Sequence, residues 1–273
     1  MPEKPSKRLF VDLPSGLLES ELPMQWPLES MELIHYLTQV VRVKPNEPLF
    51  LVDLHQSIGV EAIVYSIAKR HVVLELIHRI QPPTKKQPHI VLAASLIKEN
   101  RWDWMLQKAT ELGVSEIVPL LSEHVSFPLN LDWSKKHERW FQIVKAASEQ
   151  SERWTLPKIK PVTKLSDWLK EFQSAPHTGF HRVFGFERDE IIQIHSGSKK
   201  VIRLPLKQYM ANYSLSLSKE WLAVIGPEGG WTKMEVAELA SHHFQPVGMG
   251  TNILRAETAA IQMMGILNYE LGL

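Results

Sequence analysis

The sequence predicts a small β domain followed by an α/β domain with a largely parallel sheet. The chain has 273 residues, 44% of them hydrophobic, which is enough for one large or two ordinary domains with real cores. Residues 81–88 contain three prolines without apolar periodicity, which indicates a stiff, exposed linker at 82–88. Short β-prone runs precede this linker, whereas strands and helices alternate after it, as in parallel sheets covered by helices.

The first predicted domain covers residues 1–81 and consists of short apolar runs separated by turns. Three of these runs are expected to be strands of a small barrel or sandwich, at residues 49–52, 62–67 and 72–77.

The second predicted domain covers residues 89–273. Its first half is expected to begin with a strand at 89–94, a helix at 103–112 closed by Gly113, and a strand at 116–120. A long helix at 134–151, a helix from 166 onward capped by Ser166 and Asp167, and a strand at 183–186 are expected to follow. Residues 187–220 are polar and poorly periodic, so an inserted loop or hairpin is expected there.

A glycine-rich loop at residues 226–230, Gly-Pro-Glu-Gly-Gly, follows an apolar run at 222–225 that predicts a buried strand. Thr232 and Glu235 have the spacing of a capping box, so a helix is expected to begin near Lys233. The expected buried face of this helix consists of Met234, Ala237, Ala240 and Phe244.

A second glycine loop follows a short strand expected at 247–249. After this loop, a closing helix is predicted from an apolar stripe made of Ala260, Met264, Leu267 and Leu271. The end of the chain therefore predicts a strand, loop and helix, twice in succession.

The two glycine loops lack the patterns of the common phosphate-binding loops. Neither loop has the P-loop motif or the dinucleotide-binding glycine pattern, which argues against ATPase and dinucleotide functions. Glycine nevertheless allows unusual backbone angles and the close approach of a ligand to peptide groups. Taken alone, the loop at 226–230 is equally consistent with a tight turn that binds nothing.

Four motifs resemble, in the same order, those of the ribosomal RNA small-subunit methyltransferase E (RsmE) family. They are Gln-Lys-Ala-Thr-Glu-Leu-Gly-Val at 107–114, Ala-Ala-Ser-Glu-Gln-Ser-Glu-Arg at 146–153, Ile-Gly-Pro-Glu-Gly-Gly at 225–230 and Leu-Arg-Ala-Glu-Thr-Ala at 254–259. The resemblance covers most of the chain. It implies a SPOUT-class domain that binds S-adenosylmethionine in a trefoil knot near the C-terminus, forms a homodimer and methylates N3 of a uridine in 16S ribosomal RNA.

The first domain resembles the PUA-like β-barrel that precedes the catalytic domain in this family. Residues 8–11 and 35–42 match two of the family's segments, whereas Asn46 stands where a turn glycine is usual; asparagine tolerates left-handed backbone geometry. The resemblance gives three candidate RNA contacts, for which solvated surface charge is an equally open interpretation: Arg8, His35 and Arg42.

A second basic set lies near the start of the second domain, interleaved with tryptophans. The cations are Lys98, Arg101, Lys108, Lys145 and Arg153, and the rings are Trp102, Trp104, Trp140 and Trp154. Cations that bind phosphates beside rings that stack on bases suit single-stranded RNA. The alternative is that the tryptophans belong to the core.

The resemblance also implies the residues of a cofactor pocket. A sulfonium cofactor needs backbone groups at its polar ends and an apolar wall for its ring. The positions that match the family's cofactor loops are Ile225, Gly226, Gly230, Met249, Gly250, Ile253 and Leu254.

Methylation at N3 of uracil requires an unpaired base from which a proton is removed. Arg255 is expected to stabilise the charge that develops on the base, because its planar fork suits planar acceptors. Glu228 and Glu257 are the candidate bases. Two other interpretations stay open: Glu228 braces its own turn, and Glu257 interacts with helix amides.

Composition excludes several classes of site. The absence of cysteine excludes disulfides and thiolate metal sites, and His177 and His181 lack the glutamate of a helical zinc motif, so no metal site is expected. The net charge of +1, from 31 basic and 30 acidic side chains, means that RNA binding depends on local clusters. Without a signal-like or membrane-spanning run, a soluble cytoplasmic protein is expected.

The leading hypothesis is therefore an S-adenosylmethionine-dependent methyltransferase acting on N3 of a uridine in 16S ribosomal RNA. One alternative keeps the SPOUT chemistry but changes the RNA target. The other is a dimeric RNA-binding protein of ribosome assembly without catalytic turnover.

Overall fold

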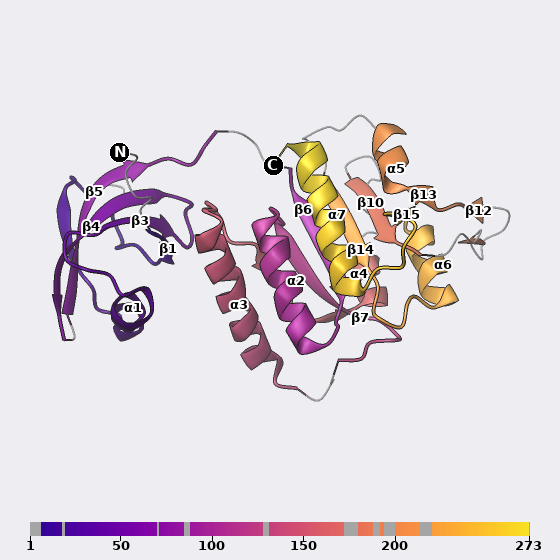
Figure 1. Cartoon of the computed structure of the whole chain (residues 1–273), viewed down its shortest axis with the longest axis horizontal. Helices are drawn as coiled ribbons and strands as arrows, with labels where there is room; N and C mark the ends of the chain where they lie inside the picture. The colour runs from indigo at the N-terminus through magenta and orange to yellow at the C-terminus, as the bar shows by residue number, and fades with distance from the viewer. Residues whose placement is uncertain are drawn as a thin grey trace. The chain divides into compact units, whose positions relative to one another are not determined.

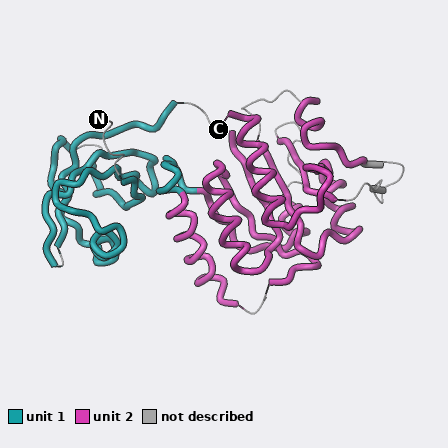
Figure 2. The backbone as a smooth tube through the Cα atoms, in the orientation of Figure 1, with its two compact units in different colours: residues 1–85, 148–156 teal, residues 86–147, 157–273 magenta. Residues whose placement is uncertain are grey.

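The computed structural model describes residues 7–17, 20–69, 71–84, 88–127, 131–171, 180–187, 192–193, 200–212 and 220–272. The chain divides into two compact units, shown in teal and magenta in Figure 2. Unit 1 contains residues 1–85 and 148–156, and unit 2 contains residues 86–147 and 157–273. Residues 85–87 of the expected linker and half of the expected insertion at 187–220 lie outside the described residues.

Unit 1 is built around a five-stranded sheet in the order β1-β3-β4-β5-β2. Strands β1 and β3 are parallel, and the other neighbours are antiparallel. The elements are β1 (Lys7–Val11), β2 (Met24–Pro27), α1 (Met31–His35), a π-helical turn η1 (Tyr36–Val41), β3 (Pro48–Asp53), β4 (Gly59–Ala68) and β5 (His71–Ile80). The three strands predicted for this domain are confirmed, and Asn46 has the left-handed geometry expected of it, with φ 62°.

Residues 49–52 of strand β3 are all apolar because both faces of this strand are covered. Leu49 and Leu51 lie in one hydrophobic cluster of unit 1, whereas Phe50 and Val52 lie in another. The second cluster is covered by Trp154, whose ring meets that of Phe50 edge-on at 5.3 Å. The segment 148–156 therefore completes a core of unit 1.

Unit 2 contains a parallel sheet in the order β13-β15-β10-β14-β6-β7-β8, with β9 also paired to β7. The strands are β6 (Ile90–Ser95), β7 (Glu116–Leu121), β8 (Lys158–Ile159), β9 (Thr163–Lys164), β10 (Phe180–Gly185), β13 (Leu204–Pro205), β14 (Glu220–Ile225) and β15 (Gln245–Gly248). Two further short strands, β11 (Ile192–Gln193) and β12 (Lys200–Val201), form an antiparallel pair. The predicted α/β class and parallel sheet are confirmed.

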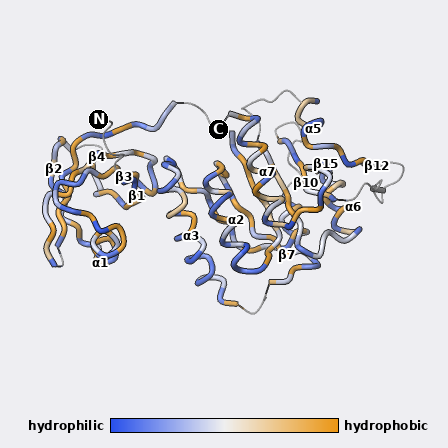
Figure 3. The backbone as a smooth tube through the Cα atoms, viewed as in Figure 1, coloured by the Kyte–Doolittle hydropathy of each residue, from blue (hydrophilic) through white to orange (hydrophobic). Residues whose placement is uncertain are grey.

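Helices cover both faces of this sheet (Figure 1). In β6, Leu92 and Ala94 pack with α2, α3, α5 and α7, whereas Val91 and Ala93 pack with α4 and α6. The helices are α2 (Glu99–Glu111), α3 (Trp133–Gln150), α4 (Leu165–Lys170), α5 (Leu206–Asn212), α6 (Lys233–Ser241) and α7 (Ala256–Leu271). Hydrophobic and hydrophilic segments alternate along α2 and α3 in Figure 3, as expected for helices with one buried face.

Three local predictions are wrong. Helix α2 begins at Glu99 rather than Asp103, and Lys164 rather than Ser166 or Asp167 is the N-cap residue of α4. Met234 is 77% exposed although it was expected to be buried. The buried face of α6 is centred on Val236 and Ala240, and at 3.6 residues per turn Met234 lies almost opposite to that face.

The N-terminus of α6 has the predicted capping box. The Thr232 hydroxyl accepts a hydrogen bond from the Glu235 amide at 3.2 Å, and the Thr232 amide donates to the Glu235 carboxylate at 2.8 Å. Replacing Thr232 with alanine is expected to lower the free energy of unfolding by about 1 kcal/mol, because one amide loses its acceptor. Urea unfolding measures this change. Thr155→Ala, at an exposed position, is the control, and equal losses in the two variants would argue against a contribution from the cap.

Candidate active site

A cavity of about 900 Å³ lies in unit 2 at the carboxyl ends of β10, β14 and β15. Its wall consists of residues 185–187, 225–231, 247 and 249–256, together with Arg101, Arg203, Lys233, Val236, Ala237 and Ala259. In open parallel sheets, ligands bind outside the carboxyl ends of the strands. The volume is within the range of small-molecule sites.

Both glycine loops contribute to this one cavity. All seven residues that the sequence suggested for cofactor binding line it: Ile225, Gly226, Gly230, Met249, Gly250, Ile253 and Leu254. The loops meet because β15 lies beside β10, and β10 lies beside β14. Sequence reasoning did not include Trp231 or the segment 185–187, although both follow the same strand ends.

Position 226 lies so close to a neighbouring ring that only glycine fits there without a shift. A Cβ atom at this position would lie 2.7 Å from the ring of Trp231. That ring is held in place, because its Nε1 donates a hydrogen bond to the Gly185 carbonyl at 3.1 Å. Gly250 has another requirement: its φ of 147° is one that residues with side chains rarely adopt, although the space beside it is open.

The segment after β7 supports the loop at 226–230 from another side. The Ser126 hydroxyl donates to Glu228 Oε2 at 2.6 Å, and His124 Nδ1 lies 3.1 Å from the Gly230 carbonyl oxygen. A Cβ atom on Gly229 would lie 2.7 Å from the His124 Cβ. Sequence reasoning did not identify these residues; the usable signal is their position directly after a strand of a parallel sheet.

The predicted catalytic residues differ in their position relative to the cavity. Arg255, the exposed residue that precedes α7, lines the cavity, and so does Glu228, whose side chain is 22% exposed. The side chain of Glu257 is only 6% exposed and is not part of the wall. Within the described part of the chain, Glu257 Oε2 has no hydrogen-bond partner.

Arg101 was predicted to contact RNA, but the structure gives it two protein partners. Its guanidinium forms an ion pair with Glu228, and its Nε lies 3.6 Å from Glu257 Oε1. One cation therefore lies between the two carboxylates that the sequence suggested as bases.

Arg8 forms contacts inside unit 1. Its guanidinium lies 4.5 Å from the ring centre of Phe50 and 5.0 Å from that of Trp154. It also donates to the carbonyl oxygens of Glu152 and Arg153, at 2.5 and 3.1 Å. Burial lowers the pKa of Arg8 from its ordinary value. These contacts attach the segment 148–156 to the sheet of unit 1.

The other predicted RNA contacts fall into two groups. His35, Arg42 and Lys98 are exposed. Lys108 pairs with Glu111 at 2.8 Å, and Arg153 Nε donates to the Thr155 carbonyl at 3.2 Å. Burial lowers the pKa of Arg153 to about 10, so this side chain stays charged at neutral pH.

The tryptophans near these cations have different environments. Trp102 and Trp140 are fully buried with ring centres 5.4 Å apart, so they belong to the core of unit 2. Trp104 is 48% exposed. Among the residues that the structure describes, no group of three histidine, aspartate or glutamate side chains is arranged to hold a metal ion, and no helix has the length and apolarity of a membrane span. His177 lies outside the described residues.

Comparison with known protein families identifies the class of protein to which this fold and this cavity belong. Residues 84–268, most of unit 2, match the RNA methyltransferase domain family. The chain is also similar to a crystal structure of ribosomal RNA small subunit methyltransferase E from Neisseria gonorrhoeae bound to S-adenosyl methionine. That match has a TM-score of 0.76 and 24% identity over 97% of this chain and 98% of the other, which shows the same fold.

Two curated relatives narrow the class further. Ribosomal RNA small subunit methyltransferase E of Mesomycoplasma hyopneumoniae is 32% identical over 70% of this chain and 74% of its own length. The protein of the same name from Bacillus subtilis is 26% identical over 97% of this chain and 96% of its own. The chain belongs to the ribosomal RNA small subunit methyltransferase E family.

Proposed function

We propose that this protein uses S-adenosylmethionine to methylate N3 of a uridine in 16S ribosomal RNA. The observation that supports this most strongly is the meeting of both family-specific glycine loops at one cavity in unit 2. Ribosomal RNA as the substrate class is inferred from membership of the family. The uridine and its N3 atom are inferred from the sequence resemblance.

The cavity wall suits the two ends of the cofactor. Gly226, Gly230 and Gly250 line the cavity and carry no side chain of their own, so their backbone groups can meet the polar ends of the cofactor, and Ile225 and Leu254 offer an apolar surface to the adenine. When bound, S-adenosylmethionine supplies an electrophilic methyl group. The chain's own task is to hold the base in line with it, which accounts for much of the acceleration in such displacements.

The two carboxylates receive different roles in this proposal. Glu228 lines the cavity, so its carboxylate is placed to accept the N3 proton of the uracil. Glu257 is buried behind the wall and acts through its contact with Arg101. Arg255 stabilises the negative charge that develops on the uracil ring and orients its oxygens.

RNA binding is assigned first to the exposed side chains of His35, Arg42 and Lys98, which are accessible to phosphates. Arg8, Lys108 and Arg153 contribute charge near the RNA while holding protein structure. The substrate is 16S ribosomal RNA in the small subunit or its precursor.

The proposal includes the wider properties implied by the resemblance: a SPOUT-class trefoil knot, a PUA-like first domain at residues 1–81, a methyltransferase domain at 89–273, a homodimer and a cytoplasmic location. Within the second range, the segment 148–156 belongs to unit 1. The order β15-β10-β14 supports the knot. After β14 the chain crosses to the far side of β10 and then returns to pack α7 near β14.

Deletion of the gene tests this function. Small-subunit RNA from the deletion strain is expected to lack one N3-methyluridine, and a plasmid copy of the gene is expected to restore it. Mass spectrometry of RNA fragments measures the modification. Loss of a methyl group elsewhere would indicate another RNA target, and intact methylation with RNA binding but no S-adenosylmethionine binding would favour an assembly protein.

A further inference from the structure

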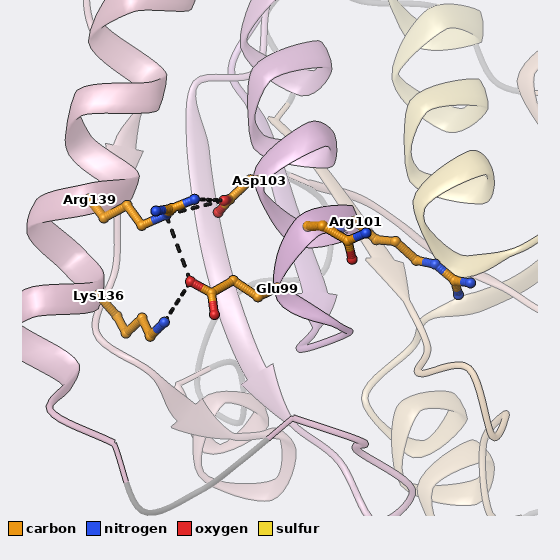
Figure 4. Close-up of polar contacts among 6 residues, drawn as sticks. Glu99, Arg101, Asp103, Lys136 and Arg139 are labelled. Atoms are coloured by element: carbon orange, nitrogen blue, oxygen red, sulfur yellow. Dashed lines mark hydrogen bonds and ion pairs between the residues drawn. The ribbon is translucent and has the colours of Figure 1, made fainter.

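The first turns of α2 carry charged side chains on two different sides. On one side, Glu99 pairs with Lys136 and Asp103 pairs with Arg139, both at 2.6 Å. Figure 4 shows that Arg101 points away from this cluster. The helix thus separates a surface ion-pair group from a single arginine on the cavity side.

Arg101 connects the two cofactor loops through their carboxylates. Glu228 belongs to the loop at 226–230, and Glu257 lies in the first turn of α7, directly after the second loop. The Arg101 side chain is 30% exposed and lines the cavity, so it touches both partners from the wall. Of the three side chains, Glu257 is the most deeply buried.

The contacts of Arg101 with Glu228 and Glu257 require a side chain that can meet two carboxylates at once. A buried carboxylate is costly unless a cation or hydrogen-bond donors compensate it, and the N-terminus of α7 alone gives partial compensation. The guanidinium is a fork with five donors, so it can meet two carboxylates in different directions. Lysine has a single charged nitrogen and cannot reproduce both contacts.

We infer that Arg101 is a positioning residue of the cofactor site, which fixes the loop at 226–230 against the start of α7. This role replaces the phosphate contact expected from the sequence. The inference rests on the proposed binding of S-adenosylmethionine in this cavity. Without Arg101, Glu228 and Glu257 repel each other, and the two loops lose their shared partner.

The test is the affinity of R101Q for S-adenosylmethionine, measured by titration calorimetry with the full chain. We expect an affinity about tenfold to a hundredfold weaker than that of the wild type, because two charge-assisted contacts are lost. R139Q is the matched control: it removes an arginine from the ion-pair group on the other side of α2 and should leave the affinity unchanged. R101K should lie between R101Q and the wild type.

Measurements of RNA binding distinguish the positioning role of Arg101 from a direct contact between Arg101 and phosphate. If Arg101 binds phosphate, R101Q keeps its affinity for S-adenosylmethionine but reduces the salt dependence of RNA binding by about one counterion, and that result overturns the inference. Wild-type affinity in R101Q also overturns it, even if the melting temperature falls. If R101Q does not fold, R101K decides, and wild-type affinity in R101K counts against the inference. A wild-type protein that binds no S-adenosylmethionine contradicts the proposed function itself.

Discussion

Replacing Arg255 with glutamine is expected to reduce kcat of the proposed methyl transfer by about 10²–10³-fold. Arg255 lies at the cavity wall, directly before α7, and its side chain makes no hydrogen bond or ion pair with any residue that the structure describes. It is therefore free to bind the substrate. Because its interaction with the uracil strengthens as negative charge develops, its loss should lower kcat more than it weakens binding.

The measurement is single-turnover methylation of small-subunit RNA, together with titration of S-adenosylmethionine. The affinity for the cofactor and the melting temperature of R255Q should stay close to those of the wild type, since no protein contact is removed. Lys207→Gln, at an exposed position on α5, is a control for the loss of one positive charge. An unchanged kcat in R255Q would remove Arg255 from the catalytic mechanism.

Replacing Gly226 with alanine is expected to weaken the binding of S-adenosylmethionine by about tenfold to a hundredfold. The added Cβ would lie 2.7 Å from the Trp231 ring, so either the ring or the loop has to move. Trp231 cannot move without breaking its hydrogen bond to the Gly185 carbonyl. Overpacking of this kind costs about 1–3 kcal/mol, and the displaced atoms form the cavity wall.

A second glycine provides the matched control. Gly265 lies in the middle of α7, and a Cβ on it meets no atom within 4 Å among the described residues. Gly265→Ala should stabilise the protein by about 0.5–1 kcal/mol, because alanine favours the helix, and should leave cofactor affinity unchanged. Calorimetric titration compares the two variants. Equal affinities in the Gly226 and Gly265 variants would show that the contact with Trp231 does not shape the cofactor site.

The sequence predicted those features that are local or periodic. The run at 222–225 and the capping box of Thr232 and Glu235 are confirmed, because strands covered on both faces are apolar throughout and caps depend on near neighbours. Met234 was misassigned because the pattern of α6 is short, and several apolar stripes fit nine residues equally well. The two glycine loops were assigned to one pocket only through the resemblance, since no spacing shows that β15 lies beside β10.

The roles of the charged residues were harder to predict. Arg101 and Arg8 were suggested as RNA contacts from their charge, and the sequence does not show the distant protein partners that the structure gives them. Arg101 contacts Glu228 and Glu257, and Arg8 contacts the segment 148–156, each across a long stretch of chain. Contacts of this kind depend on how the elements pack, which neither composition nor periodicity records.

The origin of the segment 148–156 has a consequence for biosynthesis. Both of its flanks belong to unit 2, yet Trp154 and Leu156 pack against the cluster of Phe10, Phe50 and Val52 in unit 1. A ribosome delivers the chain from the N-terminus, so strands β6 and β7 of unit 2 are synthesised before unit 1 has all of its core. Synthesis of unit 1 thus begins first, but its folding cannot be completed until residues 148–156 have been made. A fragment cut at the proline linker would leave the aromatic face of β3 uncovered.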